Sequence, residues 1–140
     1  MIERTKTARF GGEDVANRLA QLGDTEFDEL SFGVIGLDSQ GVVRAYNAAE
    51  SKLAGRPKVE VIGQRFFEVL APCARTVEFQ GRYLDVRNGK LDSALFEHVL
   101  DHRMNPTRVF IHLKRTVLGD GMWILVRRRP PSISQWLGST

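Results

Sequence analysis

The sequence lacks most of the features that mark secreted, membrane and fibrous proteins. It contains one cysteine in 140 residues, so no internal disulfide can form, and small disulfide-stabilised secreted domains are excluded. Its longest apolar runs, such as 35–37 and 122–126, are far shorter than the roughly 20 residues that cross a bilayer. No apolar segment typical of a secretory signal follows Met1. We therefore expect a single cytoplasmic domain without a membrane anchor.

The sequence also lacks a large excess of charge of either sign. Twenty Lys and Arg residues oppose 17 Asp and Glu residues, which gives a net charge of +3. The run 127–129 consists of three arginines and equals that whole excess. Short basic runs can meet phosphates, but most are solvated ends of elements, and no aromatic residues interleave with this one. We predict no nucleic-acid partner.

Apolar spacing near the N-terminus predicts a helix followed by a β-hairpin. Val15, Leu19 and Leu22 have the i, i+4, i+7 spacing of one helix face. Because a helix with a single apolar stripe must pack on something, residues 1–29 are predicted to form a helical cap on the main body. The following β-rich stretches flank an Asp/Gly turn and predict a hairpin over 30–46.

The rest of the chain predicts short helices and then three strands. Asn47 is a suitable N-cap for a helix over 48–53, and residues 78–86 have the pattern of an amphipathic connecting helix. Three β-rich segments with tight turns between them then cover 94–102, 107–116 and 122–128. We predict an α+β fold with a five-stranded antiparallel sheet flanked by helices, a core over 30–128 and a C-terminal extension over 129–140.

Cys73 is the first candidate for chemistry. A lone cysteine is commonly a small buried hydrophobic residue, but Pro72 precedes this one in a predicted loop, where a thiol is accessible. A cysteine hydrolase would need a histidine base with an orienting partner, and all three histidines lie in predicted strands. One cysteine with scattered histidines also lacks the ligand spacing of a metal site, so no metal is predicted. The residues alone leave open a structural and a reactive thiol.

Tyr46 and Glu50 form the second candidate. Tyr46 ends a predicted strand, and Glu50 lies one turn into the helix that follows. This spacing brings a phenol and a carboxyl group to the sheet face on which the helices pack. Since glutamate is seldom fully buried, a solvated Glu50 is the more common outcome of such a pattern.

Several stretches closely resemble the photoactive yellow protein family, the blue-light receptors of the PAS superfamily. The similarity runs over roughly residues 8–128 without large gaps. General PAS domains lack both the Ala-Pro-Cys loop and the Tyr/Glu pair, so the resemblance is specific. The matching stretches are 10–14, 32–38, 46–50, 61–67, 71–73, 78–81, 104–107 and 119–123.

The resemblance implies a covalent chromophore and assigns roles to residues of this chain. In the family, the cysteine that matches Cys73 carries p-coumaric acid as a thioester. The residues that match Tyr46 and Glu50 donate hydrogen bonds to its phenolate oxygen, and the arginine that matches Arg56 lies over the ring. The remaining pocket positions implied by the resemblance are Phe66, Phe67, Leu100 and Met104.

The implied chemistry follows from the electrostatics of burial. A buried phenol tends to stay neutral, but two short donors aimed at its oxygen stabilise the phenolate. Glu50 must itself stay protonated to donate, so the phenolate and Glu50 share one negative charge. In the family, light isomerises the chromophore, the proton moves from the glutamic acid to the phenolate, and the uncompensated carboxylate loosens the fold into a partly unfolded signalling state.

Four features depart from the family pattern. Ala54 stands where a threonine usually bonds the tyrosine, and Leu100 replaces an aromatic residue. His98 and His102 occupy positions where tyrosines are common, and the tail after Arg128 is additional. We expect these changes to affect tuning and kinetics more than attachment.

The sequence thus predicts a blue-light photoreceptor that signals to a downstream protein and is not an enzyme. Two alternatives remain at this point. One is a PAS binding module with another small ligand or none, and the other is a redox sensor or thiol enzyme that uses a reactive Cys73.

Overall fold

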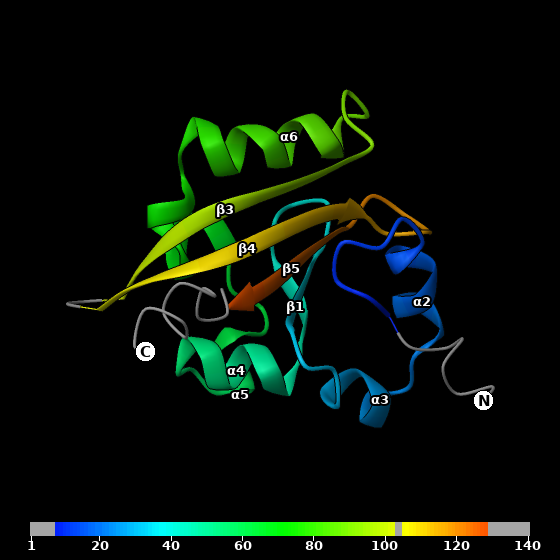
Figure 1. The fold of residues 1–140 in the computed structure, drawn as a ribbon, viewed down its shortest axis with the longest axis horizontal. Coiled ribbons are helices and arrows are strands. Elements are labelled where there is room, and N and C mark those ends of the chain that lie inside the picture. The colour runs from blue at the N-terminus through cyan, green and yellow to red at the C-terminus, as the bar shows by residue number, and fades with distance from the viewer. Residues whose placement is uncertain (1–7, 103–104, 129–140) are drawn as a thin grey trace, which may run out of the picture.

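The protein forms a five-stranded antiparallel sheet with helices on both of its faces (Figure 1). The structure is a computed structural model. It describes residues 8–102 and 105–128, and it describes the side chains of these residues except those within 100–107. The strands are β1 (Gly33–Leu37), β2 (Val43–Tyr46), β3 (Ser93–His102), β4 (Asn105–Arg115) and β5 (Met122–Arg128). They lie in the order β2-β1-β5-β4-β3. The five-stranded sheet predicted from the sequence is confirmed.

The helices are short and fall into two groups. Before the sheet come α2 (Val15–Gln21) and α3 (Asp24–Asp28). Between β2 and β3 lie α4 (Ala48–Ala54), α5 (Lys58–Val61) and α6 (Arg82–Arg87), joined by π-helical turns over Phe66–Leu70 and Val77–Gly81 and a 3-10 turn over Pro72–Ala74. The predicted connecting helix over 78–86 is therefore one π turn continued by α6. Among the described residues, no helix is both long and apolar enough to span a membrane.

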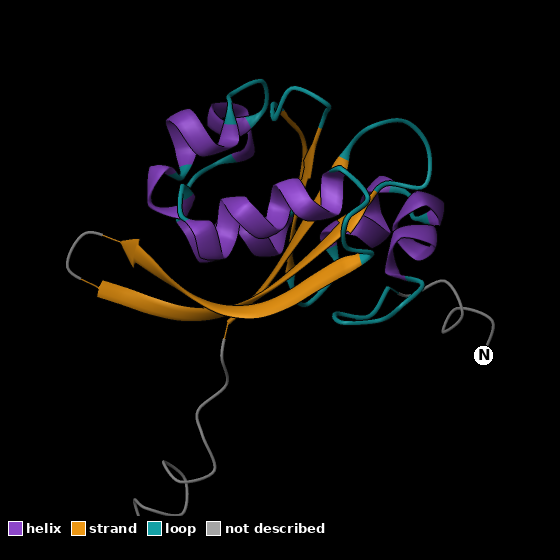
Figure 2. Ribbon diagram, turned by 90° about the horizontal axis from the view of Figure 1, so that it is seen from above, coloured by secondary structure: helices purple, strands orange, loops and turns teal. Residues whose placement is uncertain are grey.

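Alternation along the strands separates an inner from an outer sheet face. Val109, Ile111 and Leu113 of β4 are fully buried on the inner face. This face packs against the segments between β2 and β3, and Figure 2 shows α6 lying over the concave side of the curved sheet. The inner core is rich in aromatic rings, which come from Phe66, Phe67, Phe79 and Tyr83.

The outer face carries the N-terminal segment. Val34 of β1 and Leu125 of β5 are buried there, in one cluster with Val15 and Leu19 of α2. The apolar stripe that the sequence places on this helix is thus the surface that attaches it to the sheet. Pairing of β1 with both β2 and β5 puts this attachment directly behind the inner core.

Candidate functional site

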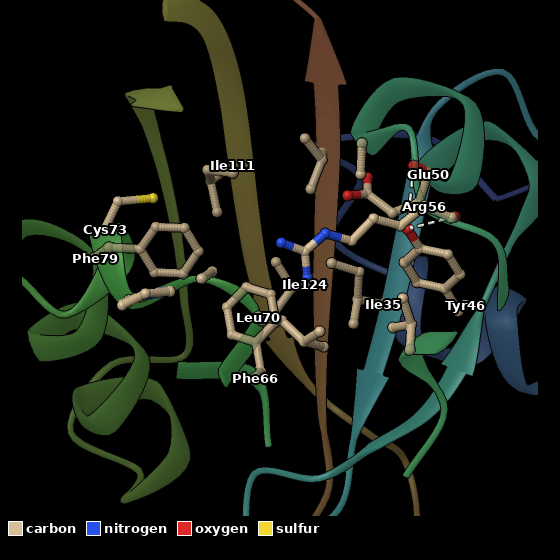
Figure 3. A pocket seen from close by; sticks show the side chains of 15 residues that line it. Ile35, Tyr46, Glu50, Arg56, Phe66, Leu70, Cys73, Phe79, Ile111 and Ile124 are labelled. Atoms are coloured by element: carbon tan, nitrogen blue, oxygen red, sulfur yellow. Dashed lines mark hydrogen bonds between the residues drawn. The ribbon is translucent and has the colours of Figure 1, made fainter. Parts of the chain in front are cut away.

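A cavity of about 250 Å³ lies between the inner sheet face and the segments that follow β2. Its walls are mostly apolar and include Ile111 and Ile124 from the sheet and Phe79 from the helical layer. Figure 3 shows the polar groups gathered at two separated places, with Tyr46 and Glu50 on one side and Cys73 on the other. Apolar walls with a few placed polar groups are typical of a small-molecule site.

Glu50 lies deep in the carboxyl end of this cavity. Its side chain is 5% exposed, and its Oε1 atom has no hydrogen-bond partner among the described residues. Burial raises the pKa of Glu50 to about 8, because the charged form loses its hydration. The common expectation of a solvated glutamate therefore does not hold here, and a neutral carboxyl group is the stable form at neutral pH.

Gly33 of β1 makes room for this buried carboxyl group. A Cβ atom at Gly33 would overlap the Glu50 carboxyl oxygen and lie 3.2 Å from the Glu50 Cα atom. The strand and α4 therefore approach each other so closely that a side chain at position 33 would require Glu50 or the backbone to shift. The sequence contained this signal as a glycine inside a β-rich run, but nothing in the sequence connected it with Glu50.

Tyr46 reaches the same end of the cavity from the last position of β2. Its hydroxyl group donates to the Arg56 carbonyl oxygen at 3.3 Å and, at the longer distance of 3.5 Å, to that of Glu50. Burial and the neighbouring Glu50 raise the pKa of Tyr46, while Arg56 opposes this shift. The phenol is therefore a stable neutral donor.

Asn47 connects this end of the cavity to the N-terminal helices. Its Oδ1 atom accepts from the backbone N–H groups of Glu50 at 3.0 Å and Val34 at 2.9 Å, and its Nδ2 group donates to the carbonyls of Phe27 and Phe32. Sequence analysis identified Asn47 only as the N-cap of α4. Its links to β1 and to α3 are long-range contacts that no local pattern reveals.

Cys73 lies in a different environment. It is an exposed free thiol in the 3-10 turn Pro72–Ala74, and it also lines the cavity. Of the two possibilities that the sequence left open for this residue, the geometry excludes a thiol buried in the core. An exposed thiol on a short turn is available for covalent modification.

Arg56 extends between the two ends of the cavity (Figure 3). It follows Gly55, whose φ of 69° ends α4 in the left-handed conformation that favours glycine. The Arg56 backbone is held by Ser51, whose hydroxyl group donates to the Arg56 carbonyl oxygen at 2.7 Å. Arg56 is exposed and lines the cavity, so it adds a charged group to mostly apolar walls.

The other predicted site residues differ in their position relative to the cavity. Phe66 lines the cavity, whereas Phe67 is not one of the described lining residues. Adjacent residues of this turn point in different directions, and the Phe67 ring packs edge-on against Phe66 and Tyr83, with centroids 4.9 Å apart in both pairs. Phe67 therefore supports the wall from behind. Met104 and the side chain of Leu100 lie outside the described part of the structure.

His98 lies on the inner face of β3, beside the cavity wall. Its ring packs edge-on against Phe79 at 5.0 Å, and its Nε2 atom is buried without a partner among the described residues. Burial lowers the pKa of His98, an effect that the nearby Glu78 opposes. His98 and Phe96 both contact the Phe79 ring, because residues two positions apart in a strand lie on the same face. The described residues contain no cluster of three or more potential metal ligands.

Comparison with known proteins first gives the class. A family profile described as PAS fold matches residues 27–122, which contain β1 to β4, the helical layer and most of the residues that line the cavity. The protein is therefore a PAS domain.

More similar relatives then define the family within this class. The photoactive yellow protein of Rhodothalassium salexigens is 49% identical over 121 residues, covering 86% of this chain and 96% of the relative. That of Halochromatium salexigens is 46% identical over 120 residues, covering 85% and 95%. The solved photoactive yellow protein domain from the sensor histidine kinase Ppr of Rhodospirillum centenum is 38% identical, with a TM-score of 0.76 and coverage of 81% and 99%. The chain belongs to the photoactive yellow protein family.

Proposed function

We propose that this protein is a blue-light photoreceptor whose chromophore is p-coumaric acid, attached to Cys73 as a thioester. Family membership supports a sensory PAS photoreceptor in general terms. The observation that carries the finer proposal is the pairing of an accessible thiol with a buried, neutral carboxyl group across one apolar cavity.

The residues of the cavity fit such a group. The unpartnered Oε1 atom of Glu50 offers a buried hydrogen-bonding position that nothing else in the described structure fills. Tyr46 supplies a second hydroxyl donor beside it, and apolar side chains surround the space between these groups and the thiol. When bound, the chromophore supplies absorption of blue light and a change of shape about its double bond.

Glu50 and Tyr46 would tune the bound group by donating to its phenolic oxygen. A neutral carboxyl is a strong donor to a charged oxygen, and such a bond in a dry cavity stabilises the phenolate. If Glu50 gives up this proton, its carboxylate remains buried, with only Arg56 as a nearby described cation among the lining residues. An unpaired buried charge costs several kcal/mol, which is a large part of the stability of an ordinary domain.

Asn47 provides a physical route from this event to the N-terminal cap, proposed to be residues 1–29. The same side chain caps the helix that carries Glu50 and donates to the Phe27 carbonyl of α3 at 3.2 Å. A shift of α4 therefore strains the attachment of the cap, which we propose to separate from the core (30–128) before the sheet opens. The released surface would be read by a downstream signalling protein, as fits a fold also present in a sensor histidine kinase. The output is a change of conformation and not the turnover of a substrate.

Reconstitution tests this proposal directly. We expect the purified chain, treated with activated p-coumaric acid, to become yellow, to bleach after a blue flash and to recover in the dark. A colourless protein with a reactive Cys73 would instead favour the redox sensor. A colourless protein with an unreactive thiol would favour a PAS module for another small ligand.

A further inference from the structure

The outer sheet face is only partly covered by the N-terminal helices. Beyond the edge of this cover, the outward side chains of β3 include Leu95, which is 59% exposed, and Val99, which is 42% exposed. Phe110 of β4 is half-buried and pairs with Glu97, which lies between these two residues on β3. Leu95, Val99 and Phe110 are thus neighbours on one face, and we call them the outer patch.

The outer patch adjoins the N-terminal cover. The Arg127 guanidinium group lies over the rings of Phe10, at 5.2 Å, and Phe110, at 5.7 Å. A Cβ atom built on Gly11 would lie 3.9 Å from Leu95. Single exposed apolar residues are ordinary, but the outer patch groups two exposed and one half-buried apolar side chain around Glu97. Because this group continues a buried interface, it indicates a surface with an occupant.

The chain leaves the sheet at this surface. Arg128, the last residue of β5, pairs with Val109 of β4, which pairs with His98 of β3. The exit from β5 is therefore two strands away from Val99, or about 10 Å at the usual strand spacing. Pro130 and Pro131 follow after one further residue, and proline has no N–H group to donate to a neighbouring strand.

The residues after the prolines match the outer patch in chemistry and in reach. Residues 130–140 contain no charged side chain, while Ile133, Trp136 and Leu137 have the i, i+3, i+4 spacing of one helix face. Ile133 lies five positions after Arg128 in the chain, and five steps of extended chain can span about 17 Å. The N-terminal residues 1–7 are a poorer match, because they include three charged side chains and only two large apolar ones.

We propose that the C-terminal segment 129–140 folds back over the outer patch, with Ile133, Trp136 and Leu137 packed on Leu95, Val99 and Phe110. The segment is then a second cover on the outer face, beside the N-terminal one, and Arg127 lies between the two. While it is bound, it screens this part of the sheet from other proteins. This inference does not depend on the chromophore.

Fluorine NMR of the full chain labelled with 5-fluorotryptophan tests the proposal, since the chain has only two tryptophans. Trp136→Phe assigns the two resonances. We expect the Trp136 resonance of the native chain to differ from its position in denaturant. In a Leu95→Ser, Val99→Ser double variant it should move to the denatured position, while the Trp123 resonance stays in place. Both substitutions remove exposed side chains and leave the inner core unchanged.

Leu84→Ser is the matched control, because Leu84 is 40% exposed but lies on α6, on the other side of the sheet. It should leave the Trp136 resonance unchanged. A native Trp136 resonance at the denatured position would overturn the proposal, as would equal effects of the patch and control variants. A Trp136 resonance that moves on tenfold dilution would also overturn it, because the patch would then be covered by a second copy.

Discussion

The two ends of the cavity differ in nearly every physical respect. The carboxyl end is formed by a strand, a capped helix and a glycine that permits close approach, and Glu50 and Asn47 are almost completely buried there. The thiol end is a short 3-10 turn between two π turns, and Cys73 is exposed. The carboxyl end is buried, and the thiol end is open to solvent.

This difference corresponds to two chemical requirements that a single environment cannot meet. Covalent loading needs a thiol that a reactant can approach. A carboxyl group that donates at neutral pH needs a raised pKa, and for Glu50 loss of hydration on burial is the cause. Separating the two along one cavity lets each requirement be met without compromising the other.

The largest expected effect comes from removing the thiol. Cys73→Ser should abolish stable attachment of the chromophore and leave the fold intact, since the side chain is exposed and the change is nearly isosteric. Mass spectrometry after reconstitution measures the adduct, and circular dichroism checks the fold. An adduct on the serine variant would contradict attachment at Cys73, and with it the assignment of the thiol end as the loading end.

A pH titration of stability tests the carboxyl end in the chain without chromophore. The pKa of Glu50 is about 8 in the folded protein and ordinarily 4.5, so between these values the folded state holds a proton that the unfolded chain has released. The contribution of Glu50 to stability should be fully present below pH 4.5 and be lost as the pH rises toward 8, by several kcal/mol in total. Denaturant unfolding across this range measures the effect.

Glu50→Gln provides the matched comparison for this titration. The amide cannot ionise, so the decrease between pH 4.5 and 8 should disappear, while effects of His98 and His112 remain in both proteins. Parallel pH profiles of the native and variant chains would show that Glu50 is not protonated in the folded state.

Gly33→Ala should disturb the carboxyl end through the backbone. The added methyl group meets Glu50 and forces β1 and α4 apart, at an expected cost of about 1–3 kcal/mol. Gly81→Ala is the control, because a Cβ atom there meets only Val77, at an ordinary 3.6 Å. Equal free energies of unfolding for the two variants would contradict a tight contact at Gly33.

The smallest expected effect concerns the missing hydroxyl group at position 54. Ala54 lines the cavity, and the acceptors of Tyr46 among the described residues are backbone carbonyl groups. Ala54→Thr should give Tyr46 a further partner, stabilise the phenolate and lower the pH at which the yellow form bleaches. Ala54→Val adds similar volume without a hydroxyl group. If both variants shift the bleaching pH equally, packing and not hydrogen bonding is responsible.

The comparison of the two ends also shows which features a local pattern can predict. The Asn47 cap, the end of α4 at Gly55 and the strands were predictable, because each depends on residues near one another in the chain. The different positions of Phe66, which lines the cavity, and Phe67, which packs on Tyr83, were not predictable, because adjacent residues in a π turn face different neighbours. Nor was the burial of Glu50, which depends on Gly33, 17 positions earlier in the numbering.

By itself, the sequence determined the α+β class, the order of the elements and the residues that resemble a photoreceptor site. Periodicity, caps and turns are local, so they specify helices and strands without reference to the rest of the chain. Only the tertiary structure decided that Glu50 is neutral and Cys73 exposed, and that Asn47 joins the cavity to α3. Burial and protonation depend on atoms brought together from distant parts of the chain, and these determine the chemistry of the cavity.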